Sequence, residues 1–395
     1  MHQRWIVLWI MVGVRIAIGF QFQAVASVSH HLIGEFSLNF AEIGTMVGLY
    51  LLPGIAFALP GGMIGHKFGE RRTIIVGLAL MTVGGVVSAV GKDVALLWTG
   101  RAVCGAGVVM LFIMMTKTIG DWFAGRQLFL AMSIFLNGWP VGMGIALLTQ
   151  GWLAEHFGWR TVFLISSGIC AAALLTMVAL YPRRDAAEHK AAAAAFRLRL
   201  GLSNRELLMV SIAGILWTLN NSTQSVVQAF GSSFLESRGI PRLTADQLLS
   251  LNVWLSIIGV PFGGWIISRY GRPNFFMNAS FVAGALVILF VALGGGAGFL
   301  FALLGCVIFF GAAVIVTLPA EATQPHNRVA GFGVFYFWWF AGMALLPPIG
   351  GWTRDISGDP AAPLYFAAGI DLACVLLLFW FRAMQRRAPA SLAIR

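Results

Sequence analysis

The chain of 395 residues is 59% hydrophobic and only 10% charged, and its mean hydropathy is +0.84. Soluble globular domains carry about 25% charged residues, so this composition excludes an ordinary soluble protein and predicts one embedded in lipid. The formal net charge of +11 would suit a nucleic-acid partner, but the places where the Lys and Arg residues fall give that charge another meaning.

Apolar runs recur at regular intervals along the whole sequence. A membrane-spanning helix needs roughly 20 apolar residues. We expect twelve such helices, at about 5–29, 40–62, 73–90, 95–116, 127–150, 161–181, 206–230, 246–268, 274–294, 297–318, 329–351 and 363–382. Arg15 interrupts the first run and eleven runs follow it, so we expect this run to stay as a helix and not to be removed as a signal peptide. The predicted fold class is an all-α membrane protein with twelve transmembrane helices.

Lys and Arg residues concentrate on one side of these predicted spans. Of the 26, 19 fall in the two tails and in alternate connections, 5 fall in the other connections, and Arg15 and Arg101 lie inside spans. This asymmetry is the positive-inside pattern. It predicts a multi-pass protein of the cytoplasmic (inner) membrane, with both termini and the long central connection in the cytoplasm. The positive charge therefore indicates topology, and we expect a lipid bilayer and no nucleic acid as the partner.

The first predicted helix carries a polar face. Arg15, Gly19 and Gln23 recur every four residues and so share one side of the helix. A charge at the bilayer centre costs about 2.5–3.5 kcal/mol, so Arg15 is expected to face the protein interior, with Gly19 allowing close approach. Two interpretations follow: a cation in a translocation cavity, or a structural arginine bonded to backbone carbonyl groups.

Two related glycine-rich basic segments lie one half-chain apart. Residues 61–72 read GGMIGHKFGERR, and residues 263–272 read GGWIISRYGR, with Gly69 and Gly271 at corresponding places 202 residues apart. A second pair of matching segments, around Gly158 and Gly358, has a spacing of 200. Such internal similarity indicates a duplicated membrane protein made of two related halves.

Several short motifs in the first half, taken in order, carry a family resemblance. Besides the segment 61–72, they are Arg101, Gly105 and Gly107 in the fourth predicted helix, then Gly138, Pro140, Gly142 and Gly144 in the fifth, and Trp159, Arg160 and Phe163 at the start of the sixth. Together, and in these places among twelve spans, they resemble the major facilitator superfamily over essentially the whole chain. The fifth-helix pattern is partial, since Trp139 separates Gly138 from Pro140.

The resemblance implies two pseudo-symmetric six-helix bundles that rock around a central site by alternating access. The expected boundaries are 1–182 for the first bundle, 183–205 for a basic, Ala-rich cytoplasmic linker, and 206–395 for the second bundle. It also implies that the two basic segments gate the cytoplasmic mouth; the expected gating residues are Gly62, His66, Lys67, Gly69, Arg71, Arg72, Arg269 and Gly271. The family's usual Asp in this loop is replaced by His66, with Ser268 in the second copy, which puts the usual charged lock in doubt.

The seventh predicted helix is the most polar span. Asn220, Gln224 and Gln228 are spaced by four and form one stripe of amides. Amide groups in lipid need hydrogen-bond partners, so the stripe is expected to face either a neighbouring helix or a substrate. The resemblance favours substrate contact, because helix 7 lines the central cavity in that family.

Two features of the last two predicted helices complete the candidate site. The block from Phe335 to Phe340 holds Tyr336 and Trp339, which are expected either to form an interfacial aromatic belt or to pack against an organic substrate. Asp371 is the one acid placed near a bilayer centre. It is a candidate for proton coupling, the alternative being a neutral, hydrogen-bonded structural acid.

The sequence contains no pattern typical of an enzyme. It has no Gly-Lys-Ser phosphate loop, and its four cysteines all lie in predicted spans without metal-ligand spacing. We therefore expect no enzymatic activity, no cofactor, no metal and no disulfide. Energy for transport is expected to come from a gradient.

Arg15 and Arg101 in a low-dielectric cavity would repel each other unless an anion lies between them. We therefore predict a secondary transporter, a monomer that moves a small, anionic solute with protons or in exchange for another anion. The expected substrate-binding residues are Arg15, Gln23, Arg101, Asn220, Gln224, Gln228, Tyr336 and Trp339. Two alternatives are a proton-coupled exporter of amphipathic compounds and a membrane sensor of the same fold that does not transport.

Overall fold

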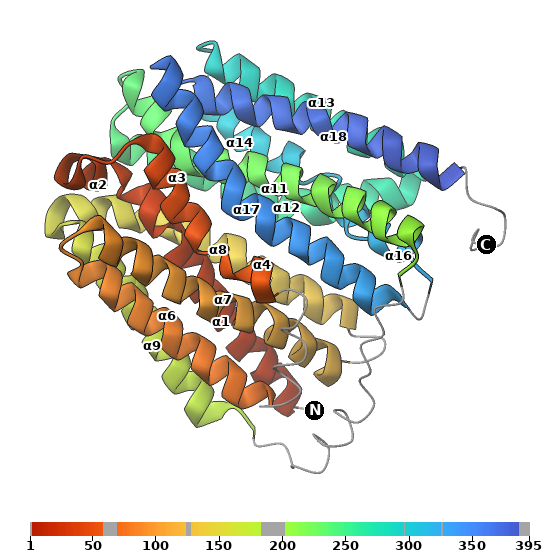
Figure 1. Ribbon diagram of the computed structural model, residues 1–395, viewed down its shortest axis with the longest axis horizontal. Coiled ribbons are helices and arrows are strands. Elements are labelled where there is room, and N and C mark those ends of the chain that lie inside the picture. Colours follow the sequence, from red (N-terminus) through yellow and green to blue (C-terminus); the bar gives the residue numbers. More distant parts are fainter. Residues whose placement is uncertain are drawn as a thin grey trace. The chain divides into compact units, whose positions relative to one another are not determined.

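The computed structural model describes residues 2–57, 69–123, 128–182, 202–295, 297–324 and 327–386, and their regular structure is overwhelmingly α-helical (Figure 1). The chain divides into two compact units, Met1–Arg197 and Leu198–Arg395, called here the N-terminal unit and the C-terminal unit. In each unit, the end that adjoins residues 183–201 is called the linker end, and the opposite end is called the distal end.

The N-terminal unit is built from antiparallel helices joined by short connections. Its helices are α1 (His2–Ser27), α2 (Ser29–Phe36), α3 (Phe40–Leu49), α4 (Pro53–Phe57), α6 (Glu70–Val90), α7 (Val94–Trp122), α8 (Leu128–Phe157) and α9 (Trp159–Leu180). Helix α1 packs along α8 and α9, while α6 packs along α7 and α9. Since α9 ends at the linker end, α6 and α8 begin there and α7 ends there.

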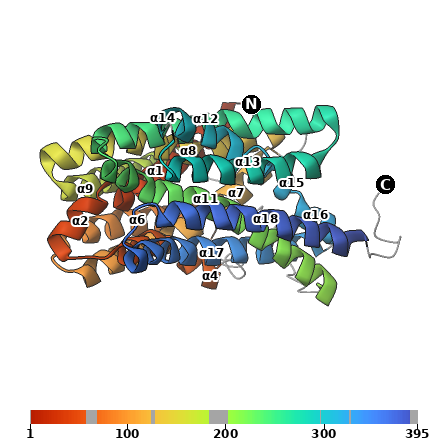
Figure 2. The same cartoon turned by 90° about the horizontal axis from the view of Figure 1, so that it is seen from above.

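The C-terminal unit repeats this scheme. Its helices are α11 (Asn204–Ser237), α12 (Arg242–Tyr270), α13 (Pro273–Ala292), α14 (Ala297–Ile308), α15 (Ala312–Ile315), α16 (Leu318–Ala322), α17 (Arg328–Ser357) and α18 (Ala362–Arg386). Helix α11 packs along α17 and α18, and α13 packs along α14 and α18. Figure 2 shows α11 with α12, α13 and α14 on one side and α17 and α18 on the other.

The glycines of the two repeated segments all have a positive φ but differ in ψ, which is 151° at Gly69 and 154° at Gly158, against 26° at Gly271 and -1° at Gly358. Gly69 (φ 86°) precedes α6, and Gly271 (φ 64°) ends α12. Gly158 (φ 83°) precedes α9, and Gly358 (φ 69°) ends α17. Positive φ is accessible to glycine at little cost and is unfavourable for other residues. The sequence repeats at spacings of 202 and 200 residues thus coincide with positions of positive φ next to a helix end.

Nine helices in the described part of the chain are long and apolar enough to cross a membrane. Helices α8 and α11, with 30 and 34 residues, are not among these nine, although their lengths suffice for a span. Helix α11 is less apolar than the nine because it carries the buried amides and hydroxyls of the predicted stripe. These helices, with the α14 to α16 series, correspond to the three remaining predicted spans.

Two of the predicted spans are interrupted. The run predicted at 40–62 is broken between α3 and α4, where Pro53 lacks the N–H needed to continue a helix. The run predicted at 297–318 is one helix only as far as Ile308. There Ser280 donates to the Val307 carbonyl and Asn220 donates at 3.1 Å to the Ile308 carbonyl. These side chains satisfy carbonyl groups that a longer helix would use.

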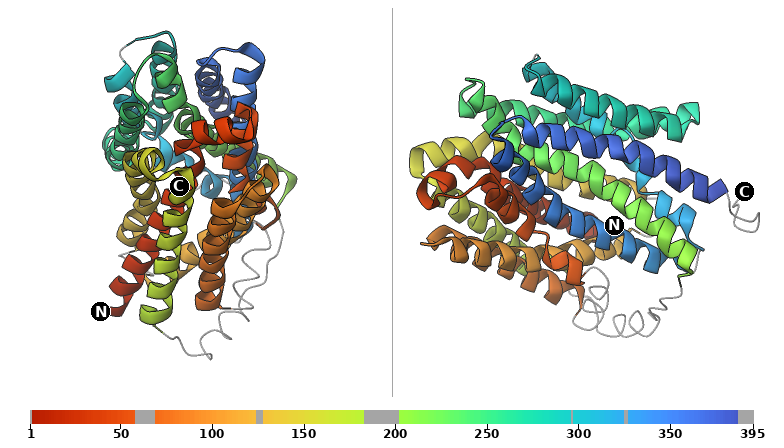
Figure 3. Two further views of the ribbon diagram at one scale, coloured as in Figure 1. Left: turned by 90° about the vertical axis from the view of Figure 1, so that its left-hand side faces the viewer. Right: turned by 45° about the horizontal axis from the view of Figure 1, so that its top comes forward.

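The apolar core of the C-terminal unit lies toward its linker end. It joins α11, α13, α17 and α18 through buried side chains that include Leu216, Phe281, Phe335, Leu378 and Phe381. Figure 3 shows α11 running between α17 and α18 in this unit. The apolar packing holds the first half of α11 and so positions the polar stripe that follows it along the same helix.

Candidate functional site

The Arg101 guanidinium is buried and bonded entirely to backbone groups. It donates to the carbonyl oxygens of Gln21 at 3.1 Å and Phe22 at 3.3 Å in α1, and to that of Met46 at 3.1 Å in α3. Its carbon Cζ lies 4.3 Å from the centre of the Tyr50 ring, and the residue is 1% exposed. Arg101 therefore fastens α7 to α1 and α3. This is the structural arrangement that the sequence suggested as one alternative for Arg15.

Arg15 lies in an aromatic setting farther along α1. Its Cζ atom is 4.7 Å from the centre of the Phe112 ring and 4.6 Å from that of Phe135. The side chain is 7% exposed. Such cation–π contacts stabilise a charge in apolar surroundings. Arg101 contacts α1 at Gln21, which is six residues, or about 9 Å, along the helix from Arg15. The two guanidinium groups therefore lie at different positions along α1.

The face of α1 that carries Arg15 packs against α8. A Cβ atom on Gly19 would lie 2.3 Å from the Trp139 carbonyl oxygen, and one on Gly142 would lie 2.1 Å from the Ile16 carbonyl oxygen. The small residues of both helices thus permit a close backbone approach, as the sequence predicted for Gly19. Gln23, on the same face, is 1% exposed. No described group accepts a hydrogen bond from its amide nitrogen.

The amide stripe of α11 is brought together by one residue that the sequence did not single out, Asn252 of α12. Its Oδ1 accepts a hydrogen bond from the amide nitrogen of Gln224 and another, at 3.1 Å, from that of Gln228. Its own nitrogen donates at 2.8 Å to the Phe301 carbonyl. Because the Phe301 carbonyl can only accept, it orients the Asn252 amide, and Asn252 in turn orients both glutamines.

The amide nitrogens of Gln224 and Gln228 are both used by Asn252, and their side-chain oxygen atoms are not. The Oε1 atoms of Gln224 and Gln228 are buried and accept no hydrogen bond from any described group. The same is true of the Asn220 Oδ1 atom, whose amide nitrogen is used by Ile308. The stripe is therefore rich in available acceptors, a property that the spacing of the residues alone did not predict.

Asp371 lies in α18, completely buried and beside Asn220. A Cβ atom on Gly284 of α13 would lie 2.5 Å from its Oδ2, so the carboxyl group fits against a glycine. Neither carboxyl oxygen makes a well-formed hydrogen bond to a described group. The predicted proton-coupling residue is thus joined to the amide stripe through Asn220.

The aromatic pair of α17 is held in edge-on contact. The Tyr336 and Trp339 rings have centroids 6.4 Å apart, and Trp339 lies 4.9 Å from Phe340. Tyr336 is 40% exposed, whereas Trp339 is 8% exposed. The two residues therefore differ in setting, and Tyr336 alone of the pair presents a large accessible surface.

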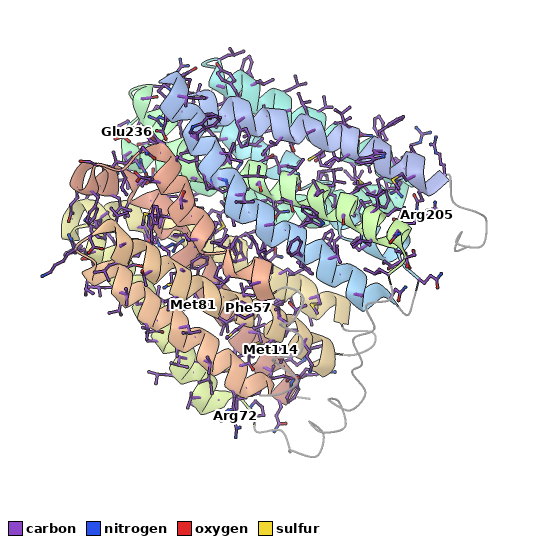
Figure 4. The ribbon with its side chains drawn as sticks, viewed as in Figure 1. Phe57, Arg72, Met81, Met114, Arg205 and Glu236 are labelled. Atoms are coloured by element: carbon purple, nitrogen blue, oxygen red, sulfur yellow. The ribbon has the colours of Figure 1, made fainter. Side chains whose placement is uncertain are left out.

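The predicted gating residues fall partly inside the described segments. Gly62, His66 and Lys67 lie outside them. Arg71 donates to the Val178 carbonyl of α9 at 2.7 Å, Arg72 is exposed, and Arg269 is exposed over the Trp265 ring. Figure 4 labels Arg72 at the linker end of the N-terminal unit.

Charged clusters that the sequence analysis missed tie helix ends together at both linker ends. In the N-terminal unit, Glu70 of α6 pairs with Lys117 of α7 at 2.5 Å and accepts from Tyr181 after α9 at 3.3 Å. In the C-terminal unit, Arg382 of α18 pairs with Glu321 of α16 at 2.5 Å and donates to Asn274 of α13 at 2.8 Å. Each cluster joins the corresponding three helices of its unit.

Neither unit gathers an obvious metal site in its described part. No group of three or more His, Cys, Asp or Glu side chains comes together there. The four cysteines are free thiols, with Cys104, Cys170 and Cys374 buried and Cys306 partly so.

Comparison with known proteins places this architecture. A profile of the Major Facilitator Superfamily matches residues 11–235 and 207–394. The chain belongs to this superfamily. A solved structure of a peptide transporter POT in complex with sulfate superposes with a TM-score of 0.71 at 16% identity, covering 96% of this chain and 94% of the other. A nucleoside transporter NupG superposes with a TM-score of 0.72 at 15% identity, covering 95% and 99%.

Sequence relatives agree with the family and differ in their cargo. Monocarboxylate transporter 12-B of Danio rerio is 24% identical over 81% of this chain and 74% of its own length. Riboflavin transporter RibZ of Clostridioides difficile is 24% identical over 46% of this chain and 40% of its own. A multidrug resistance protein B homolog of Mycobacterium tuberculosis is 32% identical over 38% and 28%. Several of these matches, including those with RibZ and the multidrug homolog, cover less than half of the relative's length.

Membership confirms the predicted superfamily and its all-α membrane fold.

Proposed function

We propose that this superfamily member is a secondary active transporter of a small anionic solute, working by alternating access with a proton as the coupling ion or with anion exchange. It would act as a monomer in the cytoplasmic membrane, with both termini and the linker in the cytoplasm. The proposal assigns the solute to cations of the N-terminal unit and the proton to the C-terminal unit.

The proposal of an anionic solute depends on the sign of the charge inside the N-terminal unit. Arg15, near the midpoint of α1, and Arg101, about two turns into α7, are both buried. Every acid in the described part of this unit lies in the first or last turns of a helix or in a connection. Arginine stays protonated in proteins, so the middle of this unit carries a positive charge that does not vary with pH. A positive low-dielectric region attracts anions.

The two arginines have different proposed roles. Arg101 uses Nε and both terminal nitrogens on carbonyl groups, so we assign it the role of a fixed brace whose charge adds to the local potential. Arg15 lies against aromatic rings, and a guanidinium group is suited in shape and charge to a carboxylate or similar oxyanion. Arg15 is therefore the proposed direct contact, with Gln23 on the same face.

Similar proteins lend this proposal some support. The relative aligned over most of this chain is named a monocarboxylate transporter, and the POT structure contains sulfate. In the C-terminal unit, Gln224 and Gln228 are proposed to bind the polar part of the solute and Asp371 to bind the proton. Gating by Gly69, Arg71, Arg72, Arg269 and Gly271 remains part of the proposal.

The first experiment is a thermal-shift screen of purified protein, since a ligand that binds the folded state raises its apparent stability. The probes are acetate, lactate, benzoate, phosphate and sulfate, set against amphipathic cations such as tetraphenylphosphonium. The strongest anion is then followed as flux into vesicles under an imposed pH gradient. We expect Arg15→Gln to lower flux at least about tenfold, the equivalent of 1.4 kcal/mol. Arg386→Gln, at the exposed end of α18, is the control and should leave flux unchanged.

A different result would favour the alternative exporter of amphipathic compounds. The 40% exposure of Tyr336 beside Trp339 and the similarity to a multidrug resistance homolog favour that reading. It predicts stabilisation by amphipathic cations but not by the anions, and flux that Arg15→Gln leaves intact. Failure of every probe to be transported would favour the non-transporting sensor.

A further inference from the structure

The polar stripe of α11 is longer than the three amides that the sequence revealed. Asn220, Gln224, Gln228 and Ser232 follow one another at four-residue intervals, and all four are at least nine-tenths buried. They span about 18 Å along the helix at 1.5 Å per residue. Figure 4 labels Arg205 and Glu236 near the two ends of α11. The stripe runs from the middle of this helix towards its distal end.

Each member of the stripe meets a polar side chain from another helix. Asn220 lies beside Asp371 of α18, and Gln224 and Gln228 both donate to Asn252 of α12. Ser232 donates to the Asp246 carboxyl of α12. A row of residues spaced by four is inclined to the helix axis, which explains why it meets α18 at one end and α12 at the other.

A buried carboxyl group therefore stands at both ends of this stripe. Asp371 is 0% exposed and Asp246 is 1% exposed. The described groups beside Asp371 include Asn220 of α11, Gly284 of α13 and Cys374 of its own helix, and none of these three is a cation. A lone carboxylate in such surroundings is costly, whereas a carboxylic acid that has bound a proton is not.

Asp246 has a different environment, with three ionisable groups in a row. Arg242 Nε lies 3.5 Å from Asp246 Oδ1, and Arg242 Nη1 lies 3.3 Å from Glu236 Oε2. Glu236 is 44% exposed at its side chain, so this cluster connects the distal surface with the buried acid. Glu236 also interacts electrostatically with Arg354 of α17, so the cluster holds two acids and two cations. Asp246 is its buried acid, and burial disfavours the charged form of a carboxyl group, which makes Asp246 a group that can bind a proton.

We propose that Asp246 and Asp371 are the two proton-binding sites of a path inside the C-terminal unit, linked by the α11 stripe. The path begins at Glu236 and Asp246 at the distal end and finishes at Asp371 in the middle of the helices. Amide groups alone do not pass protons on. The buried oxygens of Asn220, Gln224 and Gln228 that accept no bond from a described group are proposed to hold water molecules, which buried polar groups commonly do.

The proposal deepens the proton coupling proposed above and rests on it. No covalent step is involved. A proton enters at Asp246, leaves its carboxylate as it moves along water molecules, and is bound by the Asp371 carboxylate.

The test needs no solute, so its failure is distinguishable from failure of the anion proposal. Full-length protein in lipid nanodiscs is studied by infrared difference spectroscopy, which detects the carbonyl band of a protonated carboxyl group as pH is lowered. We expect two such bands from buried groups, one removed by Asp371→Asn and the other by Asp246→Asn. Asp355→Asn, at an exposed position of α17, should remove neither. A spectrum in which Asp371→Asn removes no band would overturn the proposal.

The link between the sites is tested by hydrogen–deuterium exchange of the Asp371 band. Asp246→Asn and Gln224→Leu should each slow this exchange by about tenfold or more, a barrier increase of 1.36 kcal/mol. Should Gln224→Leu fail to fold, Ser232→Ala serves in its place, since it removes one hydroxyl group only. Exchange at the wild-type rate in Asp246→Asn would show that protons reach Asp371 by another route and would overturn the path.

Discussion

The two units repeat one helical scheme and use it to bury opposite charges. In the N-terminal unit Arg15 and Arg101 are buried beyond the first turn of their helices, held by aromatic rings and backbone carbonyl groups. In the C-terminal unit the acids buried beyond the first turn of their helices are Asp371 and Asp246, which adjoin amides, a hydroxyl group and Arg242. The repeated helices thus support different chemistry.

The difference concerns what each charge can do. An arginine bonded to carbonyl groups remains a cation at every physiological pH and provides a constant field. A carboxyl group among amides can gain or lose a proton. A permanent positive charge suits the binding of an anion, and a variable one suits coupling to a proton gradient.

Replacing Arg101 should have the largest effect on stability. Arg101→Leu removes three hydrogen bonds to carbonyl oxygens of α1 and α3 and leaves unfilled volume among packed helices. We expect a loss of about 3–5 kcal/mol, in the range reported for disrupted buried networks. Thermal melting of the purified protein measures it, with Arg386→Leu at an exposed position as the control. Equal melting temperatures would show that Arg101 does not brace this unit.

The amide clamp of the C-terminal unit should give the next effect. Asn252→Leu deprives the amide nitrogens of Gln224 and Gln228 of their shared acceptor and the Phe301 carbonyl of its donor. Unpaired buried polar groups cost about 1–3 kcal/mol each, and repacking should limit the total to about 2–3 kcal/mol. Asn252→Asp, as a neutral carboxylic acid, keeps an acceptor for both glutamines and a donor for the Phe301 carbonyl, so it should lose less. Melting curves that rank these variants in the reverse order would contradict the clamp.

A smaller effect is expected where Asp371 fits against Gly284. The Cβ of Gly284→Ala would lie 2.5 Å from Asp371 Oδ2, and displacing a packed group costs about 1–3 kcal/mol. Gly369→Ala on α18 is the matched control, because its added Cβ meets nothing within 4 Å and should stabilise the helix slightly. Destabilisation of both variants by the same amount would remove the argument for a close fit at Asp371.

The smallest effect is expected at the distal surface of the N-terminal unit. Hydrogen bonds from Arg160 and then from Trp159 lower the pKa of Glu35 below its usual value. A lowered pKa in the folded state gives stability that is present above the unfolded pKa of about 4.3 and lost as pH falls through the folded one. The pair is about 40% exposed, so Glu35→Gln should cost about 0.5 kcal/mol or less at pH 7. The difference in melting temperature should shrink at about pH 3; a difference independent of pH would contradict the ion pair.

Much of the architecture follows from patterns that act over short stretches of sequence. Apolar runs predict the helices, and the repeated segments with glycines at 69, 158, 271 and 358 predict the duplication. The breaks after Leu49 and Ile308 differ in this respect. Pro53 is visible in the sequence, whereas the break after Ile308 depends on Asn220 and Ser280, which come from other helices. A residue's neighbours across the bundle are not encoded in local spacing.

The candidate site divides in the same way. The stripe of Asn220, Gln224 and Gln228 was predicted because its four-residue period is local. Asn252 is a single asparagine in an ordinary apolar helix, and only its contacts show that it orients two glutamines. The sequence contained two signals of the second acid. The four-residue period of the stripe extends to Ser232, and Asp246 follows Arg242 by four residues.

The most direct test of the division between units compares two kinds of flux in vesicles, using the anion that stabilises the protein most. Arg15→Gln should abolish both uptake driven by a pH gradient and exchange of the anion across the membrane, because both require the anion to bind. Asp371→Asn should abolish the gradient-driven uptake and preserve the exchange, since only the proton is lost. Preserved gradient-driven uptake in Asp371→Asn, or preserved exchange in Arg15→Gln, would contradict the assignment of proton and anion to separate units.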